Sequence, residues 1–238
     1  MKIQDILSKL YNGFVEALFP QGNVCHLCER ALDGYSILCD RCGNALNQLK
    51  CPAEEMAECD HPPLDVCIAA FPHEKEARKL VHQLKYDANA SVVPLLAEAL
   101  SNALIHQPHM RTQIDCVIPV PLHPIREQER GYNQAALLAR EVCFQTELEL
   151  VENVLVRQKQ TTSQTKRNRE NRLRAMQGVF RVRDAKAIQN KHVLLVDDVM
   201  TTGATAMACA EALLYEGAQS VSLLTVCRAE RKKSRRSD

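Results

Sequence analysis

The sequence predicts an α/β fold in which a mostly parallel sheet is flanked by helices, with a small N-terminal zinc-ribbon module of four cysteines in front of it. Short apolar segments such as 193–196 alternate with segments of helical periodicity, which is typical of a parallel sheet covered on both faces. The four paired cysteines lie between residues 25 and 42, where apolar core residues are scarce. The 238 residues are 46% apolar and 25% charged, as in globular domains rather than disordered chains.

The N-terminal half of the chain is expected to contain three helices and two strands. Helices are predicted where apolar residues recur every three or four positions, and strands where short apolar runs lie between turn residues. The expected elements are, in order, a helix over 2–19, a strand over 66–71, a helix over 74–84, a helix over 92–105 begun by Ser91, and a strand over 116–118.

The C-terminal half continues the alternation of strands and helices. The expected elements are a helix over 133–145, strands over 154–156 and 178–182, a strand over 193–196, a helix over 205–215 and a strand over 221–226. Gly217 caps the last helix, because glycine readily adopts the positive φ that ends many helices. Together these elements predict one sheet with helices on both faces.

Domain boundaries are expected near Pro62-Pro63 and at the start of the basic tail. We assign residues 1–67 to the N-terminal helix and cysteine module, 68–229 to the α/β domain and 230–238 to the tail. The apolar runs are far shorter than the roughly 20 residues of a membrane helix, and the N-terminus lacks the apolar stretch of a signal peptide. We therefore expect a cytoplasmic protein without membrane insertion.

The paired cysteines have the spacing C-x2-C-x10-C-x2-C. Two residues between thiolates allow one tight turn to present both sulfurs to one ion, and two such turns complete a tetrahedron. We predict a structural zinc site, which is formed by Cys25, Cys28, Cys39 and Cys42. The alternative is a redox pair, but a thioredoxin-type motif needs one CxxC rather than two.

The other cysteines lack this pairing. Cys51, Cys59, His61 and Cys67 leave open a second, irregular metal site, although their spacing favours loop and buried thiols. Single cysteines lie in apolar surroundings and are expected to be small core residues, at positions 116, 143, 209 and 227.

Charge is distributed unevenly along the chain. Residues 1–70 carry ten acidic and five basic side chains, whereas the segment 157–183 has nine Lys or Arg and one acid. The segment 228–236 has six basic residues and one acid. Such basic segments attract phosphates of small molecules or nucleic acids, although a solvated surface is the simpler alternative.

The most informative stretch is a buried strand that leads into Asp197-Asp198 and then into the loop Thr201-Thr202-Gly203-Ala204-Thr205. Ligands of open α/β sheets bind at the carboxyl edge of the strands, and backbone amides of such a loop bind phosphate. Two carboxylates beside a phosphate site fit a sugar phosphate, because carboxylates accept hydrogen bonds from ribose hydroxyls. A receiver domain also has an Asp pair after an apolar strand, but near the chain start and without this loop.

This stretch resembles the phosphoribosyl pyrophosphate (PRPP) motif of type I phosphoribosyltransferases. With Pro119–Pro124, Glu129–Gln134, Leu84-Lys85-Tyr86 and the cysteine module, the chain resembles the ComF family (ComF and GntX-like proteins) over roughly residues 23–229. The resemblance implies a phosphoribosyltransferase-like domain at 68–229. It also implies that Asp197 and Asp198 are catalytic and bind the ribose, and that Thr201, Thr202, Gly203, Ala204 and Thr205 bind the 5′-phosphate.

The same resemblance assigns the pyrophosphate side of the site. It implies a pyrophosphate loop that includes Pro119, Val120 and Pro121, and a flexible basic loop from which Arg172 or Arg174 pairs with pyrophosphate oxygens. Ala175 stands where relatives usually carry Asn, so loop closure is less firmly expected than phosphate binding. Mg²⁺ is expected to bind together with PRPP. His123 is a candidate base, although a lone His beside prolines is more often structural.

The function implied is that of a PRPP-binding phosphoribosyltransferase-like protein with an unknown acceptor, acting in natural DNA transformation (competence). Two alternatives remain open: a non-catalytic PRPP sensor, and a single-stranded-DNA-binding scaffold for DNA-uptake proteins. Aromatic residues make up only 4% of the chain and Trp is absent, so base stacking of the usual kind is expected to be sparse.

Overall fold

The computed structural model describes residues 24–32, 36–51, 62–87, 89–107, 111–158 and 178–229. Three predicted features lie outside these residues: the N-terminal helix, the basic segment that contains Arg172 and Arg174, and the basic tail.

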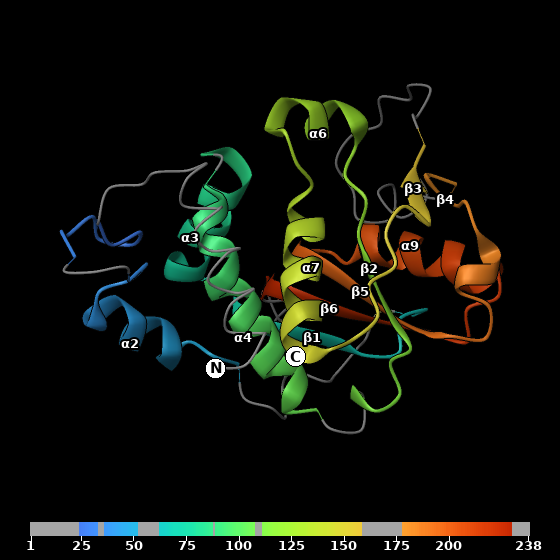
Figure 1. Cartoon of the computed structure of the whole chain (residues 1–238), viewed down its shortest axis with the longest axis horizontal. Helices are drawn as coiled ribbons and strands as arrows, with labels where there is room; N and C mark the ends of the chain where they lie inside the picture. Colours follow the sequence, from blue (N-terminus) through green and yellow to red (C-terminus); the bar gives the residue numbers. More distant parts are fainter. Residues whose placement is uncertain are drawn as a thin grey trace, which may run out of the picture.

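A four-stranded sheet with the strand order β1-β6-β5-β2 forms the centre of the fold (Figure 1). Its strands are β1 (Cys67–Pro72), β2 (Cys116–Pro119), β5 (His192–Met200) and β6 (Ser220–Arg228). All three strand pairs are parallel, which confirms the predicted parallel sheet. Because the strands run the same way, their carboxyl ends meet at one edge, and the segments that follow them converge there.

Helices cover both faces of this sheet. On one face lie α3 (Lys75–Tyr86), α4 (Val93–Ile105) and α7 (Gln134–Thr146), and on the other lies α9 (Ala204–Tyr215) (Figure 1). Side chains alternate along β5 accordingly: Leu194 and Val196 pack with the first group of helices, and Val193 and Leu195 with α9. Burial on both faces explains why these strands have continuous apolar runs. The four single cysteines are buried in this core, as predicted.

The strands at 154–156 and 178–182 do not join the parallel sheet. They form β3 (Leu155–Arg157) and β4 (Phe180–Val182), which pair antiparallel as a separate two-stranded sheet. Their apolar side chains contribute to the core on the α9 side of the main sheet. Short strands of this kind satisfy their backbone groups with each other, so their apolar character alone does not show which sheet they join.

The predicted elements differ from the structure mainly at their ends. The turn before α4 is capped by Asn89, whose side chain accepts from the Ser91 amide, so Ser91 is not the helix cap that was predicted. Asn133 caps α7 through the Ala135 amide.

Two helices were not predicted, α2 (Asp40–Gln48) and α6 (Pro124–Arg130). In α6 none of the residues is buried, so it has no apolar stripe from which a helix could be inferred.

Candidate functional site

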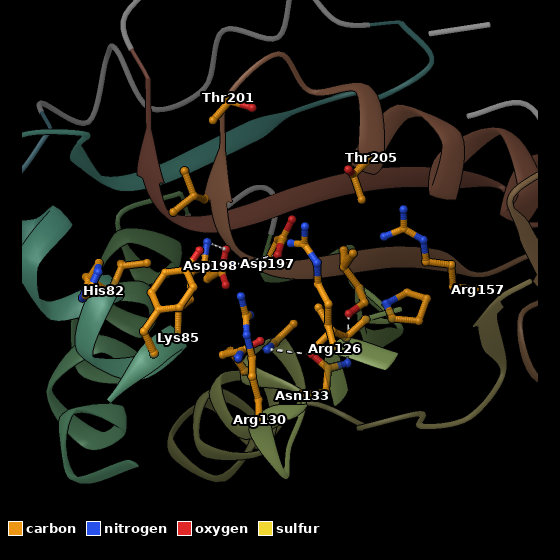
Figure 2. Close-up of a pocket in the computed structure, with 18 of the residues that line it drawn as sticks. His82, Lys85, Arg126, Arg130, Asn133, Arg157, Asp197, Asp198, Thr201 and Thr205 are labelled. Carbon is orange, nitrogen blue, oxygen red and sulfur yellow. Dashed lines mark hydrogen bonds and ion pairs between the residues drawn. The ribbon is translucent and has the colours of Figure 1, made fainter. Parts of the chain in front are cut away.

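A cavity of about 460 Å³ opens where the carboxyl ends of the strands meet (Figure 2). Six of the residues predicted to bind ligand line it: Val120, Pro121, Asp197, Asp198, Thr201 and Thr205. The loop residues Thr202, Gly203 and Ala204 line a smaller cup that shares Asp197, Thr201 and Thr205 with this cavity. Pro119 is the last residue of β2 and lines a neighbouring cavity instead. The structure therefore brings together most of the predicted site from separate parts of the chain.

The cup lies between the end of β5 and the start of α9. Gly203 has φ of 76° and is the N-cap of α9, a left-handed conformation that a residue with a Cβ adopts only with strain. The hydroxyl of Thr202 accepts a hydrogen bond from the Ala204 amide at 3.4 Å. The first amides of a helix have no partner within the helix, and the helix dipole favours an anion there. This loop therefore has the geometry of a phosphate site.

The two aspartates lie within β5, because the strand continues to Met200 instead of ending at Val196 as predicted. Lys85 of α3 forms an ion pair with Asp198, with 2.7 Å between Nζ and Oδ1. Asp197 accepts a hydrogen bond from the Asp198 amide at 2.8 Å. Burial and the neighbouring Asp198 carboxylate raise the pKa of Asp197, and the hydrogen bond and Lys85 oppose this shift only in part. One carboxylate is thus neutralised by an amine, and the other takes up a proton unusually easily.

Five basic side chains surround these carboxylates: Arg78, Lys85, Arg126, Arg130 and Arg157. Figure 2 shows Arg126 and Arg130 pointing from α6 toward the Asp pair, and Arg157 at the end of the pocket where Thr205 lies. The cavity therefore carries more positive than negative charge and suits a ligand with several phosphate groups. His73, at the same cavity, has a lowered pKa because of burial and the nearby charges of Arg78 and Lys85.

The basic residues of the cavity were not predicted from the sequence as binding residues. Lys85 and Arg130 belong to the short motifs 84–86 and 129–134, on which the family resemblance is based. That resemblance could have identified them as binding residues. Arg157 begins the basic segment 157–183, whose charge predicts attraction of phosphates, whereas Arg126 stands in no such motif or segment. Their role depends on the packing of α6 and β3 beside the sheet edge, which periodicity does not reveal.

The motif 129–134 joins three parts of the pocket. Gly131 ends α6 with φ of 79°. The hydroxyl of Tyr132 donates to the Leu84 carbonyl at the end of α3, at 2.8 Å. The side-chain amide of Asn133 donates to the Val120 carbonyl at 3.0 Å. These bonds hold α3, α6 and the segment after β2 in a fixed arrangement around the cavity.

His123 has a structural role in this arrangement. Its Nδ1 accepts a hydrogen bond from the Ile125 amide at 3.3 Å and thereby caps α6. It does not line the main cavity. The structural interpretation of this histidine is therefore favoured over a role as a base.

The four cysteines Cys25, Cys28, Cys39 and Cys42 form one cluster, in which the sulfurs all lie within 4.8 Å of one another. Burial alone would raise the pKa of Cys25, but backbone amides of Cys39, Cys28 and Leu27 donate to its sulfur and lower the pKa to about 6. Four sulfurs at this spacing fit the donor set of a tetrahedral zinc site. Cys59 and His61 lie outside the described residues, and within the described part of the chain Cys51 and Cys67 belong to no such cluster.

The cysteine module docks on α3. Gln83 donates to the carbonyl of His26 at 2.7 Å, and Lys79 donates to the carbonyl of Leu27 at 2.8 Å. The buried Asn89 side chain lies 2.8 Å from Nδ1 of His26. The helix that carries Lys85 is thus held by the cysteine module along its length and by Tyr132 at its end.

The chain is similar to several known proteins. Residues 127–238 match the model of the family described as phosphoribosyl transferase domain. The DNA utilization protein YhgH of Shigella flexneri is 28% identical over 209 residues, which cover 86% of this chain and 90% of that protein. Competence protein F of Haemophilus influenzae is 25% identical, covering 88% and 92%. Competence protein ComFC of Bacillus subtilis is 36% identical over 48% of this chain and 44% of its own length.

None of the helices in the described part of the chain combines the length and the apolar character needed to cross a bilayer.

The cysteine cluster leads to a prediction about metal content. We expect one zinc ion per chain in freshly purified protein, measured by elemental analysis. Replacing Cys39 by Ser should abolish zinc binding and unfold the cysteine module, because so small a module has little core of its own. Cys143→Ser, which changes a buried thiol outside the cluster, should leave the zinc content unchanged. A metal content near zero in the unaltered protein would contradict the prediction.

The raised pKa of Asp197 leads to a prediction about stability and pH. Its folded pKa of about 7 lies above the ordinary value of 3.8, so folding takes up a proton between these pH values. The contribution of Asp197 to stability therefore falls as pH rises from about 4 to about 7. Asp197→Asn should raise the melting temperature more at pH 8 than at pH 5.

Asp65→Asn, the same substitution at an exposed position outside the cavity, is the matched control. Melting curves of both variants at several pH values are the measurement. If Asp197→Asn changes the melting temperature equally at pH 5 and pH 8, ionisation of Asp197 does not destabilise the folded protein.

Proposed function

We propose that this chain is a member of the ComF family with a phosphoribosyl transferase domain, and that it is a cytoplasmic protein that binds PRPP at the edge of its sheet. The proposal depends on one observation, which is that a phosphate-sized cup and a charged cavity adjoin each other. The cup at 201–205 shares residues with a cavity that has two aspartates and five basic side chains. A sugar that carries phosphate at one end and pyrophosphate at the other fits this distribution of groups.

In this proposal each part of PRPP has its own partner. The 5′-phosphate lies in the cup, where the amides at the start of α9 and the hydroxyls of Thr201, Thr202 and Thr205 donate to it. The ribose hydroxyls donate to Asp197 and Asp198. Since Lys85 already pairs with Asp198, the ribose either displaces this amine or shares the carboxylate with it.

The pyrophosphate lies between the segment after β2 and α6. Val120 and Pro121 form one wall, and the guanidinium groups of Arg126 and Arg130 extend from α6 into the cavity. Planar guanidinium groups bind phosphate oxygens in a bidentate manner. Arg172 and Arg174 remain proposed as further partners. Mg²⁺ bound with PRPP would neutralise part of the pyrophosphate charge, and the carboxylates of the Asp pair are suitable oxygen ligands.

The reaction that this arrangement suits is displacement of pyrophosphate from C1 of the ribose by an acceptor. The chain contributes by holding the ribose and by stabilising the negative charge that develops on the leaving group. Asp197 and Asp198 fix the sugar while Arg126 and Arg130 take up that charge. Asp198 is buried, and exclusion of water there strengthens its interaction with the ribose.

The zinc site is proposed to be structural. Zinc would hold the cysteine module in the conformation that docks on α3 through His26, Leu27 and their partners Gln83 and Lys79. None of the four cysteines lines the proposed PRPP cavity, and this distance from the ligand supports a structural role.

A second proposed function is participation in DNA uptake with single-stranded DNA or uptake proteins as partners. The names of the relatives, which refer to DNA utilization and competence, favour it. The basic side chains around the cavity are compatible with a phosphate backbone as well as with PRPP.

The PRPP site is tested by calorimetry with PRPP and Mg²⁺. Asp198→Ala should lower the affinity by about 10- to 150-fold, since a charge-assisted hydrogen bond contributes about 1.5–3 kcal/mol. Thr202→Ala should cost less, because backbone donors remain. Gly203→Val should cost most, because a branched side chain at φ of 76° is strained and obstructs the anion.

Tyr215→Ala, at an exposed position outside the cavity, is the control and should bind PRPP as the unaltered protein does. Unchanged affinity in both Asp198→Ala and Gly203→Val would exclude this loop as the PRPP site. Assays of pyrophosphate release with a panel of acceptors then separate an enzyme from a PRPP sensor.

The DNA-binding function is tested by salt titration of single-stranded DNA affinity. We expect micromolar or weaker binding, with a log–log slope of about −3 to −4, as four to six phosphate contacts would give. Removing residues 229–238 should weaken DNA binding more than PRPP binding. Absence of binding at low salt would count against any nucleic-acid role.

A further inference from the structure

The neighbouring cavity that Pro119 lines has a volume of about 290 Å³ and lies between α7, β3 and the end of β2. The first half of α7 and its cap line it with Asn133, Ala136 and Arg140, which are three or four positions apart. The residues proposed to bind the ribose and the 5′-phosphate, 197–198 and 201–205, do not line it. We call it the second cavity, because the proposed function does not use it as a binding site.

The second cavity adjoins the proposed PRPP cavity along a shared wall, which is formed by Pro121, Leu122, Asn133 and Arg157. Of these residues Arg157 carries the one formal charge. Figure 2 shows it at one end of the PRPP cavity, on the side away from Lys85. Arg157 therefore presents a positive charge at the boundary of the two spaces.

The guanidinium of Arg157 is poorly satisfied by the described part of the chain. Its Nε is buried and has no hydrogen-bond partner there. Its guanidinium carbon lies 5.7 Å from the centre of the buried Phe180 ring, which covers one side of the group. Burial lowers the pKa of Arg157, so the cation has lost part of its hydration. An anion beside this guanidinium would replace the lost hydration.

The other charges of the second cavity leave room for such an anion. Arg140 is paired with Glu152 through two contacts, from Nε to Oε2 at 3.2 Å and from Nη2 to Oε1 at 2.9 Å. Among the ion pairs of the described residues, none includes Arg157 or Arg183, which both line the cavity. Glu127 is the remaining acid of the lining. The cavity thus has a net positive charge and two guanidinium groups for one ligand.

The backbone that carries these groups is fixed before a ligand binds. The amide of Arg183 donates to the Val154 carbonyl at 2.7 Å, which joins the end of β4 to the start of β3. Asn153, which also lines the cavity, has φ of 63°, a left-handed conformation that Asn adopts more readily than most residues. A wall that is already ordered lowers the entropic cost of binding.

We propose that the second cavity binds a phosphate monoester, separately from PRPP, with its phosphate between Arg157 and Arg183. Two guanidinium groups match the charge of about −1.5 to −2 of a phosphate monoester at neutral pH, and each binds phosphate oxygens in a bidentate manner. A ligand with a single carboxylate would leave one arginine unpaired. Hydroxyl groups of the ligand donate to Glu127, which lines the same cavity.

The inference goes beyond the proposed function and does not depend on it. Small hydroxylated phosphates and the 5′-phosphorylated end of single-stranded DNA share this chemistry. Calorimetry with two probes separates these sources: glycerol 3-phosphate, and a short single-stranded oligothymidine with a 5′-phosphate. Glycerol and the same oligothymidine without its 5′-phosphate are the matched controls. The phosphorylated probe that binds more tightly identifies the source.

Arg183→Ala is the informative variant, because Arg183 lines the second cavity and not the PRPP cavity. It should weaken binding of the tighter probe by about 10-fold, the lower end for a charge-assisted hydrogen bond, since Arg183 is exposed. Arg181→Ala removes the same charge from an exposed position of β4 that lines neither cavity, and should have no effect. The affinity for PRPP should be the same in both variants and the unaltered protein.

Gly203→Val distinguishes the second cavity from the cup at 201–205, which is also proposed to bind a phosphate. This change obstructs the cup, and the binding that depends on Arg183 should persist in it. If Gly203→Val does not fold, the comparison of Arg183→Ala with Arg181→Ala still decides the proposal, because neither residue lines the cup.

Three results would overturn the proposal. The first is an equal loss of affinity in Arg183→Ala and Arg181→Ala, which indicates a general effect of charge. The second is binding that is lost in Gly203→Val and unchanged in Arg183→Ala, which places the phosphate in the cup and supports the proposed function. The third is that neither phosphorylated probe binds more tightly than its control. Conversely, binding that depends on Arg183 in a protein without PRPP affinity supports the second cavity and rejects the proposed function.

Discussion

The ion pair between Lys85 and Asp198 connects the helix α3 to the central strand β5, at the point where the ligand cavity opens. Asp198 is buried and lies directly beside Asp197, so the two carboxylates repel each other and are poorly hydrated. The amine of Lys85 compensates for this cost by pairing with Asp198. The amine must therefore be held at this position. That requirement fixes the end of α3, and the hydrogen bonds from the cysteine module and from Tyr132 converge on this helix.

Much of this fold could be predicted from the sequence because it depends on local patterns. The continuous apolar runs of β5 and β6 are imposed by burial on both faces, and such runs are visible without a structure. The helix predicted over 74–84 is α3, and its buried residues Ala77, Leu80, Val81 and Leu84 recur every three or four positions. The spacing of the four cysteines likewise determines the cluster, since two residues between thiols suit one tight turn.

Other parts depend on long-range packing and could not be predicted in this way. β3 and β4 have the composition of core strands, but they pair with each other, and only the paired backbone shows this. The helix α6 exposes all of its residues to some extent, so its sequence contains no apolar stripe. Arg126 and Arg130 owe their importance to the position of this helix above the sheet edge. The second cavity likewise arises only when α7 and β3 meet at the end of β2.

The docking of the cysteine module on α3 has a thermodynamic consequence. One helix contacts the cysteine module through Lys79 and Gln83 and reaches the cavity at the sheet edge through Lys85. If ordering the cluster favours the position of α3 that suits the proposed PRPP site, then PRPP bound there must favour the ordered cluster by the same factor, because coupling between two sites is reciprocal. Phosphorylated ligand and metal would then protect each other, and chains depleted of either would lose the other more readily.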